Sequence, residues 1–114
     1  MTTTKQMLEN HVKDVAENEI FEAYYGNDDE NQDDSAYLDW LNGILDVMYY
    51  IGQEPGDYRG VRIAVALGGP NIYVDTLDGE VVGYWGSDTF RWPLRNEAIA
   101  LIDKDFEEQW NCAR

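Results

Sequence analysis

Apolar residues in the first part of the chain recur at the spacing of a helix. Between residues 4 and 25 they return every three or four positions, at Leu8, Val12, Val15, Ala16, Ile20, Ala23 and Tyr24. This spacing places them on one helical face, and Gly26 is a suitable C-terminal stop. A second broad apolar face runs from Ser35 to Ile51. The pattern predicts helices over residues 4–25 and 35–51, joined by the polar segment 27–34.

The period of the pattern changes in the second part of the chain. Residues 61–67 alternate between larger apolar side chains and small or charged ones, and shorter apolar runs follow at 72–76 and 81–85. Alternation with period two is typical of strands. The pair Asp78 and Gly79 is typical of a tight hairpin turn. These signals predict a three-stranded antiparallel meander over 61–67, 72–76 and 81–85.

The remaining segments complete the predicted order of elements. Residues 86–93 are predicted as a loop, and a last helix is predicted from about 95 to 110, with Asn96 as its cap. The order is α-α-β-β-β-α, which is an α+β fold. A chain of 114 residues without an internal repeat indicates a single domain, 1–114.

Charge is the most unusual property of the composition. The chain has 23 acidic and eight basic residues, a net charge of −15. Residues 1–57 carry −12 of it, and residues 58–114 carry −3. Such a balance argues against direct binding to nucleic acid or to an anionic membrane, because both require a basic face. It favours cationic partners, and it is also compatible with a generic acidic domain.

Compartment and membrane topology follow from simple features of the sequence. The N-terminal residues have no apolar stretch of the signal-peptide kind, and no apolar run approaches 20 residues. Cys112 is the single cysteine, so an intrachain disulfide is excluded. We expect a cytoplasmic protein with no membrane segment.

Candidate catalytic and metal motifs are weak. A calcium loop that starts at Asp28 has Asp33 where the turn requires glycine, and Asp39 where the motif has a bidentate glutamate. His11 and Cys112 are too few ligands for zinc. No nucleotide-binding or nucleophile motif is present. We therefore expect no enzyme activity, no cofactor and no metal.

The segment FEAYYGNDDENQDDSAYLDW, residues 21–40, carries seven carboxylates and no cation. Carboxylates fixed on helices resemble the regular charge of nucleic acid and compete for the same lysines and arginines. The alternative is that they solvate the backs of helices and a linker. The residues predicted to contact a partner here are Glu17, Glu22, Asp28, Asp29, Glu30, Asp33, Asp34 and Asp39.

The predicted sheet offers a second candidate surface. Tyr73 and Asp75 lie on the opposite side of their strand from Ile72 and Val74. Aromatic residues on a sheet face are enriched in binding sites, so Tyr73 and Asp75 are included among the candidate partner contacts. Burial beneath a helix is the alternative. Trp85 and Trp92 are expected in the core.

Part of the chain resembles a known group of proteins. Residues 67–94, LGGPNIYVDTLDGEVVGYWGSDTFRWPL, and the following AIALIDKDFEEQW resemble small acidic proteins of phages and conjugative elements of gut Firmicutes. The resemblance spans roughly residues 58–111. What it implies is genetic context, because genes of this kind often travel with accessory proteins that block host defence, including anti-CRISPR and anti-restriction proteins. It assigns no catalytic residue.

Together these observations predict a non-enzymatic inhibitor of a bacterial defence nuclease. The expected partner is a basic nucleic-acid-binding protein, whose groove the acidic surface would occupy as a mimic of nucleic acid. The alternative is a binding module of a mobile element that recognises a protein or a small ligand through an aromatic sheet face. The apolar excess of the second predicted helix leaves a monomer or a homodimer open.

Overall fold

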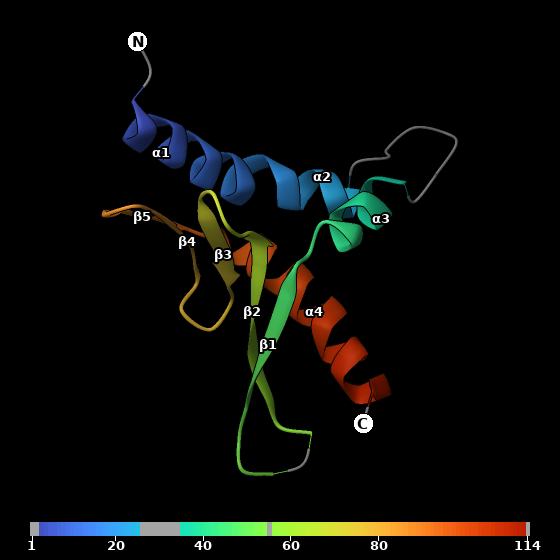
Figure 1. Cartoon of the computed structure of the whole chain (residues 1–114). Coiled ribbons are helices and arrows are strands. Elements are labelled where there is room, and N and C mark those ends of the chain that lie inside the picture. The colour runs from blue at the N-terminus through green and yellow to red at the C-terminus, as the bar shows by residue number, and fades with distance from the viewer. Residues whose placement is uncertain (1–2, 26–34, 55, 114) are drawn as a thin grey trace.

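The computed structural model describes residues 3–25, 35–54 and 56–113. At its centre is a five-stranded antiparallel sheet in the order β1-β2-β3-β4-β5, so every strand pairs with its neighbours in sequence. The strands are β1 (Asp46–Ile51), β2 (Tyr58–Ala66), β3 (Asn71–Asp75), β4 (Glu80–Trp85) and β5 (Asp88–Pro93). Figure 1 shows this meander with the N-terminal helix and the C-terminal helix packed against it.

The N-terminal helix contains a change of helical type. It consists of α1 (Thr4–Asp14), the π-helical turn η1 (Val15–Glu19) and α2 (Ile20–Tyr25). Its start is fixed by a capping box in which the Thr3 hydroxyl accepts from the Gln6 amide and the Gln6 side chain accepts from the Thr3 amide. The extent of this helix agrees with the predicted 4–25.

Two further helices complete the structure. The short helix α3 (Ser35–Asn42) follows the N-terminal helix in the chain, and α4 (Asn96–Ala113) follows the sheet. The N-terminal helix packs on β4 and β5, while α4 packs on β2 (Figure 1).

The core lies between the helices and one face of the sheet, which we call the inner face. It buries residues from the N-terminal helix, the inner face and α4, among them Leu8, Val12, Ile20, Val61, Ile63, Ile72, Val74, Val81, Ile102 and Phe106. Trp85 and Trp92 are partly buried against this cluster, as the sequence predicted. The other side of the sheet, the outer face, carries Tyr73 and Tyr84.

The predicted order of elements was wrong at residues 46–51. The second helix was expected to reach Ile51, but α3 ends at Asn42 and residues 46–51 form β1. Val47 lies opposite Ile63 and Tyr49 opposite Val61 in the β1–β2 pair. An apolar run of this length suits a helix or a strand, and pairing with β2 decides for the strand.

The predicted loop at 86–93 was also wrong. Residues 88–93 form β5, which pairs antiparallel with β4 after a turn at Gly86, where φ is +63°. The alternation of Phe90 and Trp92 with Thr89 and Arg91 was a signal for this strand. The β3–β4 connection is longer than the predicted two residues, spanning 76–79. The α+β class stands, with five strands in place of three.

Candidate functional site

The structure divides the predicted partner-binding residues into separate places. Five of them, Asp28, Asp29, Glu30, Asp33 and Asp34, lie outside the described residues, as does most of the proposed calcium loop. Glu17, Glu22 and Asp39 lie on the helical side of the molecule, and Tyr73 and Asp75 on the outer face of the sheet.

The Glu17 carboxylate accepts two hydrogen bonds, one from β5 and one from the segment between β5 and α4. It accepts from the indole N–H of Trp92 at 2.9 Å and from Nη2 of Arg95 at 2.6 Å. The bond from Trp92 and then that from Arg95 lower the pKa of Glu17. Glu17 lies within the π-helical turn η1. Its charge is therefore already matched by a cation within the protein.

Three carboxylates that no lysine or arginine of the described residues pairs with meet between the N-terminal helix and α3. Glu19 and Glu22 come from the former and Asp39 from the latter, and with Ala23, Ala36 and Trp40 they line an open hollow of about 290 Å³. We call this hollow the acidic recess. A smaller hollow of about 120 Å³ adjoins it, since Glu19, Asp39 and Trp40 line both.

The charged side chains of the recess wall are mainly carboxylates. No lysine or arginine is among the described residues that line either hollow, and the nearest basic group on their walls is the imidazole of His11. Burial and then the charge of Asp14 raise the pKa of Glu19, and His11 opposes the shift. Glu19 therefore holds its negative charge at a cost that an incoming cation would offset.

The shape of the recess suits a cationic side chain better than a bare metal ion. Among the described residues, no group of three or more histidine, cysteine or carboxylate side chains is arranged to hold a metal. The hollow is wide, and the indole of Trp40 forms part of its wall. Indole rings attract lysine and arginine head groups, and carboxylates supply the opposite charge.

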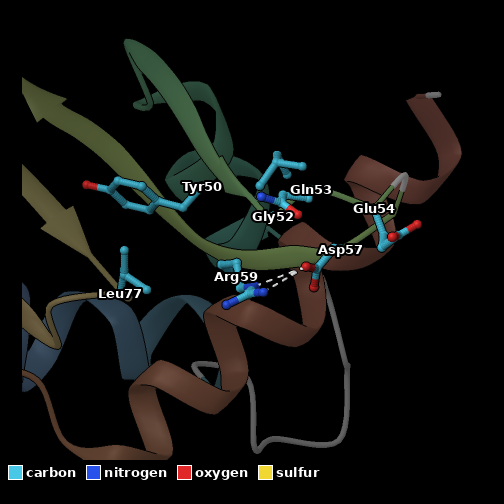
Figure 2. Close-up of a pocket in the computed structure, with 8 residues that line it drawn as sticks. Tyr50, Gly52, Gln53, Glu54, Asp57, Arg59 and Leu77 are labelled. Atoms are coloured by element: carbon cyan, nitrogen blue, oxygen red, sulfur yellow. Dashed lines mark hydrogen bonds and ion pairs between the residues drawn. The ribbon is translucent and has the colours of Figure 1, made fainter.

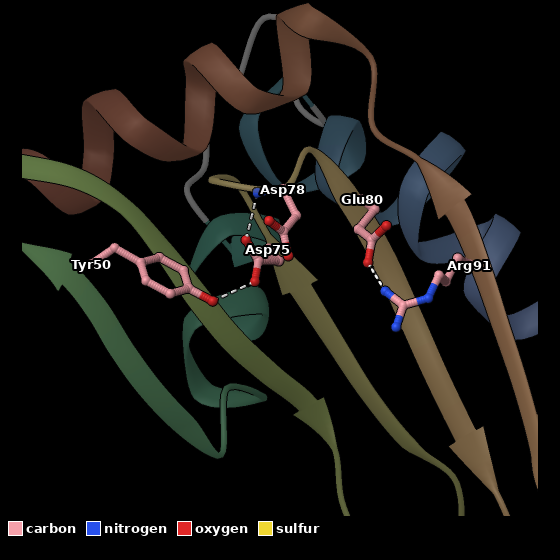
Figure 3. Close-up of polar contacts among 5 residues, drawn as sticks. All are labelled: Tyr50, Asp75, Asp78, Glu80 and Arg91. Carbon is pink, nitrogen blue, oxygen red and sulfur yellow. Dashed lines mark hydrogen bonds and ion pairs between the residues drawn. The ribbon is translucent and has the colours of Figure 1, made fainter.

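The outer face of the sheet is arranged differently. The guanidinium of Arg62 lies 4.0 Å from the ring centroid of Tyr73, which in turn meets Tyr84 edge-on at 6.2 Å. Arg91 forms an ion pair with Glu80 on the same face (Figure 3). These side chains thus satisfy one another across the sheet.

Asp75 stabilises the fold at the outer face by accepting hydrogen bonds. Only 4% of the residue is exposed, and its carboxylate accepts from the Tyr50 hydroxyl at 2.6 Å and from the Asp78 amide at 2.9 Å. Figure 3 shows Tyr50 reaching from β1 toward Asp75 at the end of β3. With both carboxylate oxygens occupied and little exposed surface, Asp75 offers little to a partner as the protein stands.

Carboxylates on α4 are engaged by tyrosines in the same manner. Tyr58 donates to Asp103 at 2.7 Å, and Tyr25 donates to Glu97 at 2.9 Å. Tyrosine-rich and acid-rich composition therefore has a structural use. Several acidic residues connect one helix or strand to another through hydrogen bonds, so they do not contribute to a free negative surface.

A further hollow lies at the β1–β2 turn and was not foreseen from the sequence. It measures about 580 Å³ and is lined by Tyr50, Ile51, Gly52, Gln53, Glu54, Asp57, Arg59 and Leu77 (Figure 2). Its cation, Arg59, is paired with Asp57 at 2.9 Å, so one of its two lining carboxylates is matched within the hollow. Its wall combines residues around the β1–β2 turn with Leu77 of the β3–β4 turn, which lie far apart in the chain.

The two residues considered for catalysis lie in different parts of the structure. His11 lies beside the acidic recess, and Cys112 is exposed near the end of α4. None of the described helices is long and apolar enough to cross a membrane. Comparisons of the chain with protein-family models, with curated proteins and with solved structures find no match. The resemblance of residues 58–111 to proteins of mobile elements stays a prediction.

Proposed function

We propose that this protein is a non-enzymatic inhibitor of a bacterial defence nuclease, and that it binds the basic groove of that enzyme as a mimic of nucleic acid. The observation that carries the proposal is the acidic recess. It places Glu19, Glu22 and Asp39 together, with no lysine or arginine among the described residues of its wall. The net charge of −15 supports the same partner chemistry.

The recess gives the mimicry a specific point of contact. A lysine or arginine of the partner would enter the hollow, pair with Glu22 and Asp39 and lie against the indole of Trp40. A paired cation would also offset the cost of holding a negative charge on the partly buried Glu19. Residues 26–34, which connect α2 to α3 in the chain, contain five further carboxylates. These carboxylates add to the negative charge of this part of the sequence.

The first experiment is a pull-down from bacterial lysate, with this protein as bait and a salt gradient for elution. The expected result is a nucleic-acid enzyme that elutes at moderate salt, because exposed charge pairs are screened within about 8–10 Å at such ionic strength. Gel-shift competition should then show the protein displacing DNA or RNA from that enzyme. Binding without displacement would contradict mimicry.

Charge-reversal variants locate the contact. Glu22→Lys combined with Asp39→Lys should reduce the affinity by about 10-fold or more, since each reversal replaces an attraction by a repulsion. The matched control is Glu54→Lys combined with Glu107→Lys, which makes the same change in net charge at exposed positions away from the recess wall. Equal losses in both variants would show that only total charge matters.

The second candidate function is recognition through the aromatic outer face. It is favoured by the Arg62, Tyr73 and Tyr84 side chains, which contact one another on the outer face, opposite the core that the described helices form. Such binding should depend only weakly on salt. Tyr73→Ala would abolish it and leave a mimic of nucleic acid unaffected.

A further inference from the structure

The two edges of the sheet are protected to different degrees. Among the described strands, β1 and β5 each have a pairing partner on one side only (Figure 1). Strand β5 begins with Asp88, carries the exposed charge of Arg91 and ends with Pro93, which has no backbone N–H to donate. The Lys13 ammonium lies 4.6 Å from the ring centroid of Trp92 on that strand. Charges and proline are the usual means by which an edge strand avoids pairing.

Strand β1 has none of these features beyond its first residue. After Asp46 it reads VMYYI, without charge, proline or glycine. Three large apolar side chains on or directly before it are exposed to solvent: Leu45 (56%), Met48 (45%) and Ile51 (38%). A strand of this kind, rich in β-forming residues and free along one edge, is a template for strand addition.

We propose that β1 is a homodimer interface, at which β1 of one copy pairs antiparallel with β1 of a second copy and joins two five-stranded sheets into one. The proposal does not depend on the proposed function. It follows from the edge alone, which would gain main-chain hydrogen bonds and bury Met48 and Ile51.

The lack of charge at residues 47–51 points to a second copy of the chain as the partner of β1. In a twofold interface residue i of one copy meets residue j of the other, and residues near the axis meet their own counterparts, so a charge near the axis would repel its own copy. Residues 47–51 carry no charge, although the whole chain carries −15. Antiparallel pairing of a strand with itself is also symmetric by construction, and the strand therefore offers a self-complementary surface of five uncharged residues.

The dimer should respond to salt in the opposite direction from the proposed nuclease complex. Two copies of net charge −15 repel each other at long range, and salt screens that repulsion. Sedimentation equilibrium should therefore show tighter dimers as the salt concentration rises. Partner binding through the acidic recess should weaken over the same range. The two ideas are thereby tested separately.

Two matched substitutions test whether β1 forms the dimer interface. Met48→Lys should weaken the dimer about 10-fold or more, because it buries a charge at the joined edge. Met7→Lys is the control, since Met7 on α1 is 47% exposed and Met48 is 45% exposed. Both variants reduce the net negative charge by one. A loss in Met48→Lys alone thus cannot come from total charge, which would favour association.

Backbone hydrogen exchange supplies a second readout on the unaltered protein. Amides of residues 47–51 should exchange more slowly as the protein concentration rises in high salt, while amides of β5 stay unchanged. A protein that is monomeric at every concentration in high salt would overturn the proposal. So would a dimer that Met48→Lys does not weaken, or β1 amides whose exchange is independent of concentration. Circular dichroism of each variant verifies its folding.

Discussion

The hydroxyl of Tyr24 donates a 2.7 Å hydrogen bond to Oδ2 of Asp105, which lies 81 residues further along the chain. The hydroxyl of Tyr37 donates to the same carboxylate, and Gln109 adds a third donor. Asp105 on α4 therefore holds both α2 and α3. The acidic recess lies between α3 and the N-terminal helix, so the position of its wall depends on this carboxylate.

Asp105→Asn should destabilise the protein. The substitution removes the negative charge that two tyrosine hydroxyls share, and hydrogen bonds to charged groups contribute about 1.5–3 kcal/mol each. We expect the free energy of unfolding to fall by about 1–3 kcal/mol in urea titrations. Glu107→Gln, an exposed carboxylate on the same helix, should change it by less than about 0.5 kcal/mol. Equal stability of the two variants would contradict this role.

Alkaline pH should unfold the protein by ionising its bonded tyrosines. Burial and then the hydrogen bonds to Asp105 and Asp75 raise the pKa of Tyr37 and of Tyr50, each to about 12. The ordinary value is 10.0. The folded pKa is the higher one, so this stability is complete below the ordinary value and is lost as pH rises toward 12.

Ultraviolet titration of tyrosinate measures this effect directly. Some of the eight tyrosines should ionise late in the folded protein, and all should ionise together in denaturant. Tyr50→Phe should remove one late ionisation and make the decline of stability with pH less steep. Coincident titration of every tyrosine in the folded state would refute the assignment.

Gly83→Ala tests the contact between α1 and β4. A Cβ at position 83 would lie 2.6 Å from Cγ2 of Val12 and 2.7 Å from Cδ1 of Leu8. Both side chains are fully buried, so they have little room to move. Overpacking of this kind typically costs about 1–3 kcal/mol, to be measured by chemical unfolding. Gly69→Ala is the control because its surroundings are open.

A compensating variant sharpens that test. Val12→Ala creates space at the place where the new methyl group of Gly83→Ala would clash. The double variant should therefore be more stable than the sum of the two single effects predicts. Strict additivity would indicate that the two residues do not press on each other.

Glu19→Gln should stabilise the protein at neutral pH. Burial raises the pKa of Glu19 above its ordinary 4.5, so the ionised form is disfavoured in the folded state. The stabilising contribution of the protonated form is complete below pH 4.5 and is lost as pH rises through the folded pKa. Thermal melts should show a higher Tm for the variant at neutral pH, and the gain should shrink toward pH 4.5. A lower Tm at neutral pH would show that the charge is needed for folding.

The candidate site was only partly accessible to prediction from the sequence. Glu22 and Asp39 were identified by charge, and they do line one recess. Glu17 belongs to the same charge run, yet its carboxylate accepts hydrogen bonds from Trp92 and Arg95. Periodicity cannot reveal a local change of helical type or the partner of one carboxylate. Trp40 and Glu19 entered the site only when the packing of α3 was known.

The sequence by itself determined the elements whose apolar period is unambiguous. It located the N-terminal helix, the antiparallel strands around residues 61–85 and the C-terminal helix, because each buries one continuous stripe or one alternating face. It also gave the net charge of −15, on which the proposed cationic partner is based.

Tertiary structure alone decided the rest. Residues 46–51 are compatible with a helix or a strand, and they became an edge strand because β2 offered hydrogen bonds and an apolar face to pair with. In the same way, Asp75 and Asp105 became buried acceptors only when Tyr50, Tyr24 and Tyr37 were brought to them. A local sequence pattern fixes which side chains avoid water. It does not fix which distant group satisfies a given polar atom, and that choice divides structural carboxylates from those free to bind a partner.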